Sequence, residues 1–158
     1  MKKIIFLLIL FTGCKSTADL NVNTFNFKVQ CVGDELDGSI TLMAWGNGRN
    51  RKDALEQARK NAVNELLFNG IISGEGNCNT RPLVNEVNAR EKYYKYFDEF
   101  FQDNGKYLNY ISGKDEKILK KFIRRKMNSS HGVSYYCVVR IQKNKLRESL
   151  INDQILKL

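Results

Sequence analysis

Residues 39–70 read SITLMAWGNGRNRKDALEQARKNAVNELLFNG and place a strand pattern directly before a helix pattern. The segment from Ser39 to Gly46 predicts a strand. Gly46, Asn47 and Gly48 then indicate a tight turn into the helix, because glycine tolerates the backbone conformations that turns require. The turn lacks the third glycine and the lysine of nucleotide-binding loops, so it does not predict a phosphate site.

A helix is predicted to begin after Asn50, a suitable N-cap, and to end at Gly70. Its apolar side chains recur every three or four residues and form one face: Ala54, Leu55, Ala58, Ala62, Val63, Leu66 and Leu67. The three alanines are four residues apart, and their small side chains let a helix lie close to a sheet. We therefore expect this helix to pack closely on the sheet.

Apolar periodicity and turn residues predict the remaining elements. These are strands at 25–31, 106–111 and 133–141, helices at 85–102 and 143–155, and a loop at 73–83. The strand at 25–31 is expected to form a hairpin with residues 39–46 across a turn at 32–38. The stretch 117–127 fits both a helical stripe and an alternating strand; the strand is favoured because the loop at 128–132 would join it to the next strand.

The composition fits one ordinary globular domain and argues against imidazole chemistry. The chain has 158 residues, of which 42% are hydrophobic. His131 is the only histidine, whereas most zinc sites and Ser-His-Asp triads need at least one that is well placed. His131 stands in a turn without neighbours at ligand spacing. We predict no metal, no cofactor and no catalytic residue.

The N-terminus carries an export signal. Lys2 and Lys3 precede an apolar run at 4–11, which is too short to cross about 30 Å of hydrocarbon as a helix. Phe11-Thr12-Gly13-Cys14 resembles the lipobox of bacterial lipoproteins, in which the cysteine is acylated; the alternative is an ordinary secretory signal with a chance cysteine. The resemblance implies a lipoprotein signal peptide at 1–13, a lipid on Cys14, a lipidated tether at 14–23 and one domain at 24–158.

The residues after the lipobox and the net charge indicate where the protein works. Lys15 and Ser16 stand where some bacteria place the aspartate that retains lipoproteins at the inner membrane, so we expect an outer-membrane anchor, with the periplasmic face favoured over the cell surface. Residues 1–13 contain two lysines and no acid, so the rest of the chain carries 24 basic and 17 acidic side chains, a net charge of +7. Anionic headgroups, acidic glycans or an acidic subunit would complement this charge, and nucleic acid is not expected. The basic cluster at 117–126 fits a solvated face or such a contact.

Three cysteines lie beyond Cys14, in a compartment that permits disulfides. Cys31 and Cys137 are in predicted strands, and Cys78 is in the 73–83 loop. Two of them can form one bridge, but their spacing does not identify the pair. Unpaired buried thiols remain an equal alternative.

Aromatic residues of the predicted helix at 85–102 offer a partner contact. Tyr93, Phe97 and Phe100 share one face that is expected to pack on the sheet, whereas Tyr94 and Phe101 lie about 100° around the helix. We predict that these two rings form an exposed patch for a protein partner. The alternative is that all five rings are in the core.

Two motifs carry a family resemblance. The strand, glycine turn and alanine-striped helix at 41–62, and the closing strand at 132–141 with Lys145-Leu146 behind it, resemble the LPP-twenty lipoproteins and the N-terminal domain of the flagellar protein FlgT. The resemblance implies a single small α+β domain, an antiparallel sheet with helices packed on one face. It also implies a non-enzymatic assembly or accessory component of an envelope, secretion or motility complex, with the membrane and an envelope protein as its partners.

The alternative function is a small envelope hydrolase or a glycan-binding protein that uses Asp and Tyr side chains. Asp98 and Glu99 are the nearest approach to a carboxylate pair. Adjacent positions of a helix point in different directions, so the two do not predict an acid and base pair.

Overall fold

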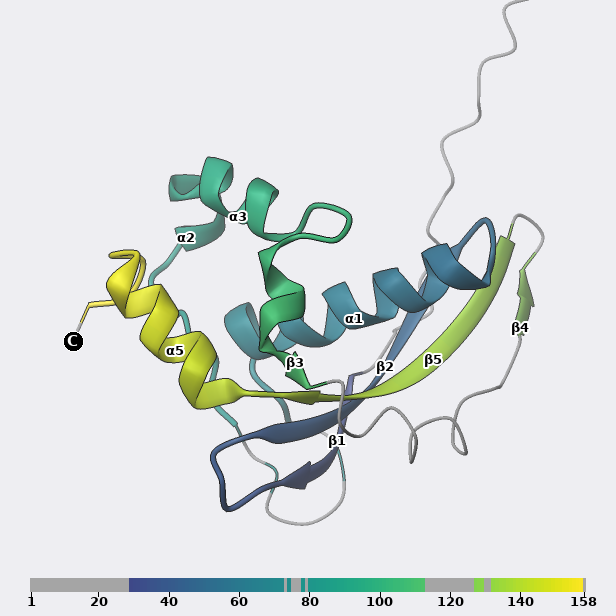
Figure 1. The fold of residues 1–158 in the computed structure, drawn as a ribbon, viewed down its shortest axis with the longest axis horizontal. Coiled ribbons are helices and arrows are strands. Elements are labelled where there is room, and N and C mark those ends of the chain that lie inside the picture. The colour runs from purple at the N-terminus through teal and green to yellow at the C-terminus, as the bar shows by residue number, and fades with distance from the viewer. Residues whose placement is uncertain are drawn as a thin grey trace, which may run out of the picture.

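The described residues form a five-stranded antiparallel sheet with the helices on one side of it (Figure 1). The structure is a computed structural model and describes residues 29–72, 74, 78, 80–112, 127–129 and 132–157. The strands are β1 (Gln30–Asp34), β2 (Ile40–Gly48), β3 (Ile111–Ser112), β4 (Met127–Ser129) and β5 (Gly132–Ile141). The helices are α1 (Arg51–Phe68), α2 (Ala89–Lys92), α3 (Tyr94–Phe100), the 3-10 helix η1 (Lys106–Tyr110) and α5 (Lys143–Asn152). The predicted α+β class with an antiparallel sheet is confirmed.

The strand order is β1-β2-β5-β3, with β4 also paired to β5. The predicted hairpin of β1 and β2 is confirmed: Asp34 pairs with Ile40, and a bulge interrupts the register between Cys31 and Gly33. β1 continues to Asp34, so the turn is shorter than predicted. β2 pairs with β5 over its whole length, which makes these two strands the centre of the sheet.

The second predicted hairpin joins β4 and β5. Met127 pairs with Ser134 and Ser129 with Gly132, so pairing extends into the stretch that the sequence predicted as a loop. Of the predicted strand at 117–127 the structure describes only Met127, and Asn128 and Ser129 of β4 belong to the predicted loop. Residues 113–126, with the basic cluster, lie outside the described part of the chain.

Helix α1 begins and ends where its sequence predicts. The backbone N–H of Asp53 donates to the side-chain oxygen of Asn50 at 3.0 Å, which confirms the N-cap. The helix ends at Phe68, and Gly70 takes a positive φ of 76°, which glycine adopts without strain. The three alanines of the stripe are completely buried against β2 and β5.

The glycines of β2 serve the contact with α1. A Cβ atom on Gly46 would stand 2.3 Å from the carbonyl oxygen of Ala54, and one on Gly48 would stand 2.4 Å from the nitrogen of the same residue. β2 runs through both glycines to Gly48 instead of stopping at Gly46. The prediction that these glycines form only a tight turn was therefore wrong, because both belong to β2. They are required there because a side chain at either position would overlap the backbone of α1.

The single helix predicted at 85–102 is wrong in its extent. Asn88 adopts a left-handed φ of 57°, so α2 begins only at Ala89, and Tyr93 leaves the helical conformation between α2 and α3. Phe97 and Phe100 are nevertheless buried, as predicted, and Tyr93 is partly buried. The predicted single helix is therefore two short helices, and the buried rings Phe97 and Phe100 both belong to α3.

The strand predicted at 106–111 is also wrong for most of its length, because residues 106–110 form η1. Tyr107 and Tyr110 are both buried. Residues three apart lie on opposite faces of a strand but on the same side of a 3-10 turn, so burial of both rings requires the turn. Only Ile111 and Ser112 pair with β5.

Helix α5 closes the core at the C-terminal end of β5. Its buried residues Leu146 and Leu150 join Leu66 and Leu67 of α1 in one apolar cluster with the inner face of the sheet. No helix in the described residues is long and apolar enough to cross a membrane.

Candidate functional site

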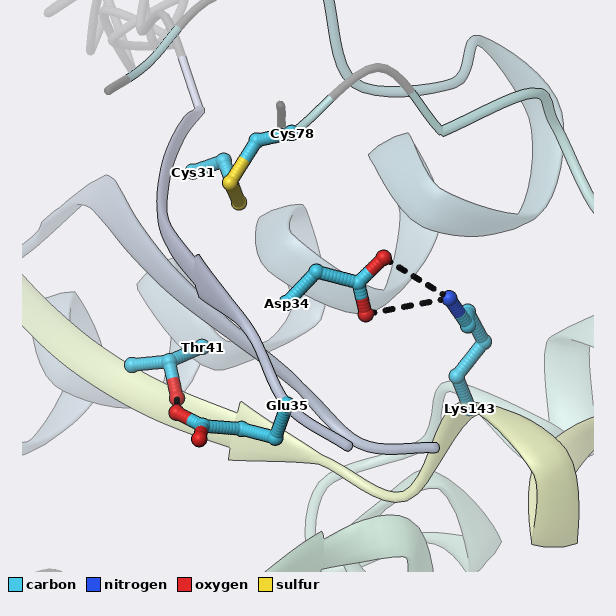
Figure 2. Close-up of a disulfide and its surroundings, with 6 residues drawn as sticks. All are labelled: Cys31, Asp34, Glu35, Thr41, Cys78 and Lys143. Atoms are coloured by element: carbon cyan, nitrogen blue, oxygen red, sulfur yellow. Dashed lines mark hydrogen bonds and ion pairs between the residues drawn. A yellow bond between two sulfur atoms is a disulfide. The ribbon is translucent and has the colours of Figure 1, made fainter. Parts of the chain in front are cut away.

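A disulfide between Cys31 and Cys78 joins β1 to the loop that follows α1 (Figure 2). The two Cα atoms are 5.8 Å apart, and the residues are 47 positions apart in sequence. Gly74 of the same loop forms an isolated parallel bridge to Cys31. The pairing that the sequence left open is thereby assigned, and the loop is fixed against the outer edge of β1.

Cys137 is the remaining cysteine within the described residues, and its thiol is free and buried. Burial raises the pKa of this thiol to about 12. A thiol in this state is protonated at neutral pH and reacts slowly. Cys137 thus behaves as a small apolar side chain of the sheet core.

The face of the sheet opposite α1 carries an aromatic pair. The register of β2 and β5 places Trp45 opposite Tyr136, and their ring centroids are 5.0 Å apart. Met43 and Val138 are the next pair on the same face. Among the described elements, every helix lies on the other side of the sheet (Figure 1).

We call these four residues, Met43, Trp45, Tyr136 and Val138, the sheet-face patch. Met43, Trp45 and Tyr136 are half-buried, so each still presents part of its surface, whereas Val138 is buried. The backbone oxygen of Trp45 accepts a hydrogen bond from Asn61 of α1 at 2.7 Å, which fixes the strand to the helix behind it. Large aromatic side chains on a rigid strand are well suited to bind another molecule.

Polar side chains flank the sheet-face patch at both ends. Ser134 donates to the side-chain oxygen of Asn47 at one end. At the other end Arg140 pairs with Asp37 at 2.9 Å and donates to Ser39 at 2.7 Å. Hydrogen bonds from the side chain and backbone of Ser39, and then the charge of Arg140, lower the pKa of Asp37.

Further contacts tie the β1–β2 hairpin to α5 and brace the hairpin internally. Lys143 lies 3.2 Å from both carboxylate oxygens of Asp34, and the hydroxyl of Thr41 donates to Glu35 at 3.4 Å (Figure 2). With the disulfide, these contacts hold the edge of the sheet to the rest of the fold. They therefore help to fix the position of the sheet that carries the sheet-face patch.

The two predicted contact residues of the aromatic segment differ in their positions. Tyr94 is 55% exposed, as expected for a contact. Phe101 packs against the core, with its ring centroid 5.0 Å from that of Phe100 and 6.1 Å from that of Tyr107. The expectation that Phe101 lies outside the core was wrong, because the chain turns after α3 and η1 brings Tyr107 against it.

Several predicted features lie outside the described residues. They are the signal peptide at 1–13, Cys14 and the tether at 14–23, most of the first strand, and His131. Asp98 and Glu99 lie within the described part and are exposed on α3. No group of three or more His, Cys, Asp or Glu side chains in the described ranges is placed to hold a metal ion.

The sequence alone does not reveal the sheet-face patch. The signal is present in the alternation of β2, where Thr41, Met43 and Trp45 occupy every second position. Which set of alternate residues faces the helices depends on the packing of α1. Comparison of the chain with protein-family models, with curated proteins and with solved structures finds no match.

Proposed function

We propose that the protein is a lipoprotein anchored to the bacterial outer membrane through Cys14, and that its domain faces the periplasm as a non-enzymatic assembly or accessory component of an envelope complex. The observation that carries this proposal is the disulfide between Cys31 and Cys78. Stable disulfides form in oxidising compartments such as the periplasm and are rare in the cytosol. The disulfide therefore supports the export that residues 1–13 indicate.

The anchor is supported by the lipobox resemblance at Cys14. A buried acyl chain contributes about 0.8 kcal/mol for each CH₂ group, and one chain alone holds a protein only reversibly. Bacterial lipoproteins of this type carry three chains, which together hold the protein for practical purposes permanently. The predicted tether at 14–23 would then join the membrane to the domain.

A protein partner is supported by the sheet-face patch. Tryptophan and tyrosine are frequent at the energetic centre of protein interfaces. Both are supplied here by central strands, so binding a partner needs little ordering of the backbone. The resemblance to lipoproteins and flagellar proteins of the envelope supports the same class of partner.

The first experiment tests the anchor in cells. Labelling with radioactive palmitate should mark the wild-type chain and should leave the Cys14→Ser variant unlabelled, with that variant recovered in the soluble periplasmic fraction. A variant that remains with the membranes after a salt wash would show that the lipid is not the anchor. Non-reducing electrophoresis of the same fractions reports whether the disulfide forms in the periplasm.

The second experiment tests the partner contact. A photo-crosslinking amino acid at position 45 and another at position 136 should capture the same envelope protein. Leu36, fully exposed in the β1–β2 turn, is the matched control position. The same capture at all three positions would contradict a specific contact at the sheet-face patch.

The Trp45–Tyr136 pair also favours a second candidate, the glycan-binding function that the sequence left as an alternative. Aromatic ring faces stack on the C–H faces of sugar rings, and polar groups beside the rings bind the hydroxyls. Sedimentation of the purified chain with insoluble peptidoglycan tests this. Binding that is lost in Trp45→Ala and in Tyr136→Ala would favour the glycan over a protein partner.

A further inference from the structure

Two residues of β5 are buried on a face of the sheet where no described helix lies. Side chains alternate along a strand, so Ser134 and Val138 face away from the core residues Cys137 and Val139. Val138 is nevertheless only 8% exposed and Ser134 only 5%. All the described helices lie on the other side of the sheet (Figure 1). The burial of these two residues therefore indicates a cover that the described helices do not supply.

The pairing of β3 and β4 shows which part of the chain can reach this face. Both strands pair with the same edge of β5, because β2 occupies its opposite edge along this whole stretch. Ser112 of β3 pairs with Arg140, and Met127 of β4 pairs with Ser134. The chain thus advances fifteen residues while β5 advances only six. Nine of the intervening residues are therefore surplus to continuous pairing along this edge.

The inner face of the sheet beside this edge is already filled. Helix α1 packs on β2 and β5, and η1 packs on β3. The surplus chain can therefore lie over the outer face, where Ser134 and Val138 are buried. We propose that residues 113–126 occupy the sheet-face patch and contact it through their apolar side chains, which are Ile118, Leu119, Phe122 and Ile123.

The length and the pattern of residues 113–126 fit this contact. In the helical alternative for this stretch, the four apolar side chains form one stripe. Fifteen residues of a helix advance about 22 Å, and six residues of a strand advance about 20 Å. A helix would thus match the distance between its two ends on β5. The stretch also contains seven lysines and arginines, which this arrangement turns toward solvent.

The N-terminal residues and a second copy of the chain are the competing occupants. The chain before Val29 enters the sheet at β1, which pairs with β2 and not with β5. Ser134 and Val138 are on β5, beside the edge at which residues 113–126 begin and end. Both are buried within a single chain, so their burial does not require a second copy. These observations favour residues 113–126.

The contact makes residues 113–126 competitors of an envelope partner. A protein that binds Trp45 and Tyr136 would have to displace the apolar side chains of this stretch. This consequence rests on the proposed function, whereas the contact within the chain depends neither on the anchor nor on a partner.

The fluorescence of Trp45 tests the contact, because Trp45 is the only tryptophan of the chain. The Cys14→Ser chain without its signal peptide is used. Ile118→Ser combined with Phe122→Ser should shift the emission to the red and increase quenching by acrylamide. Lys117→Ser combined with Lys121→Ser is the matched control and should change neither. Equal quenching of the two variants, with unchanged far-UV circular dichroism, would overturn the proposal.

Photo-crosslinking tests the contact without a change in residues 113–126, so it does not depend on whether the variants fold. A photo-crosslinking amino acid at position 136 of the same purified chain should form a covalent link to residues 113–126, which mass spectrometry of the digest identifies. A link to residues 15–28 or a covalent dimer, without a link to residues 113–126, would overturn the proposal. The absence of any link to residues 113–126 would do the same.

The competition is tested in cells. Phe122→Ser should increase the capture of an envelope protein by a photo-crosslinking amino acid at position 45, because the rings are then easier to reach. Unchanged capture would contradict the competition. If neither chain captures an envelope protein, the proposed partner contact fails, and the fluorescence and crosslinking of the purified chain still decide whether residues 113–126 occupy the patch.

Discussion

A Cβ atom on Gly46 would stand 2.2 Å from the backbone nitrogen of Ala58. Strand β2 and helix α1 therefore touch through their backbones at this point. The completely buried alanines on the helix make the same contact possible from the other side. The closeness of this contact sets how the helix lies over the two central strands.

Gly46→Ala should destabilise the protein by about 1–3 kcal/mol, because the added methyl group meets backbone atoms that cannot move aside independently. Gly33→Ala is the matched control within the same sheet. Its Cβ would meet only the side-chain oxygen of Glu35 at 3.4 Å, so its stability should change little. Urea unfolding of both variants measures the difference, and equal stabilities would contradict close packing at Gly46.

Loss of the disulfide should lower the free energy of unfolding by about 2–4 kcal/mol. The bridge closes a loop of 47 residues and restricts the unfolded chain, which is the main source of stabilisation in the entropic account. Thermal unfolding with and without reductant checks this. The double variant Cys31→Ser, Cys78→Ser should be insensitive to reductant, and sensitivity in that variant would mean that another bridge exists.

Protonation of Asp37 should remove stability as the pH falls. The folded pKa of Asp37 lies below its unfolded value, through hydrogen bonds from Ser39 and then through Arg140. Its contribution is therefore complete above the unfolded pKa, about 3.9, and is lost as the pH falls through the folded pKa. Asp37→Asn should be less stable than wild type at neutral pH, with the difference shrinking in acid.

An NMR titration of the Asp37 carboxyl gives the corresponding direct measurement. In Ser39→Ala the hydroxyl donor is absent, so the pKa of Asp37 should rise toward its ordinary value. A pKa that does not change in this variant would show that Ser39 is not the principal cause of the shift.

Tyr94→Ser and Phe101→Ser should differ in how much they lower the free energy of unfolding. Tyr94 is exposed, so its substitution should change the free energy of unfolding by less than about 0.5 kcal/mol. Phe101 packs between Phe100 and Tyr107, so its loss should cost about 1–3 kcal/mol, less than for a fully buried ring. Melting temperatures of the two single variants check this, and a large loss in Tyr94→Ser would place that ring in the core instead.

Features that depend on near neighbours in the chain could be predicted from the sequence. The Asn50 cap, the alanine stripe and the hairpin of β1 and β2 are of this kind, because capping and periodicity involve residues only a few positions apart. The lipobox is also local, and it remains a prediction. The same local rules gave the α+β class.

Contacts between distant residues decided the rest. The partner of Cys31 was settled by the turn at Gly70, which returns the loop to β1. Residues 106–110 became a 3-10 helix because Tyr107 and Tyr110 both have to reach the same core. Phe101 is partly buried because η1, which follows it in the chain, packs against it. Trp45 lies on the outer face because α1 covers the other one. Alternation shows that a strand has two faces, but only the packed helix determines which of them is buried.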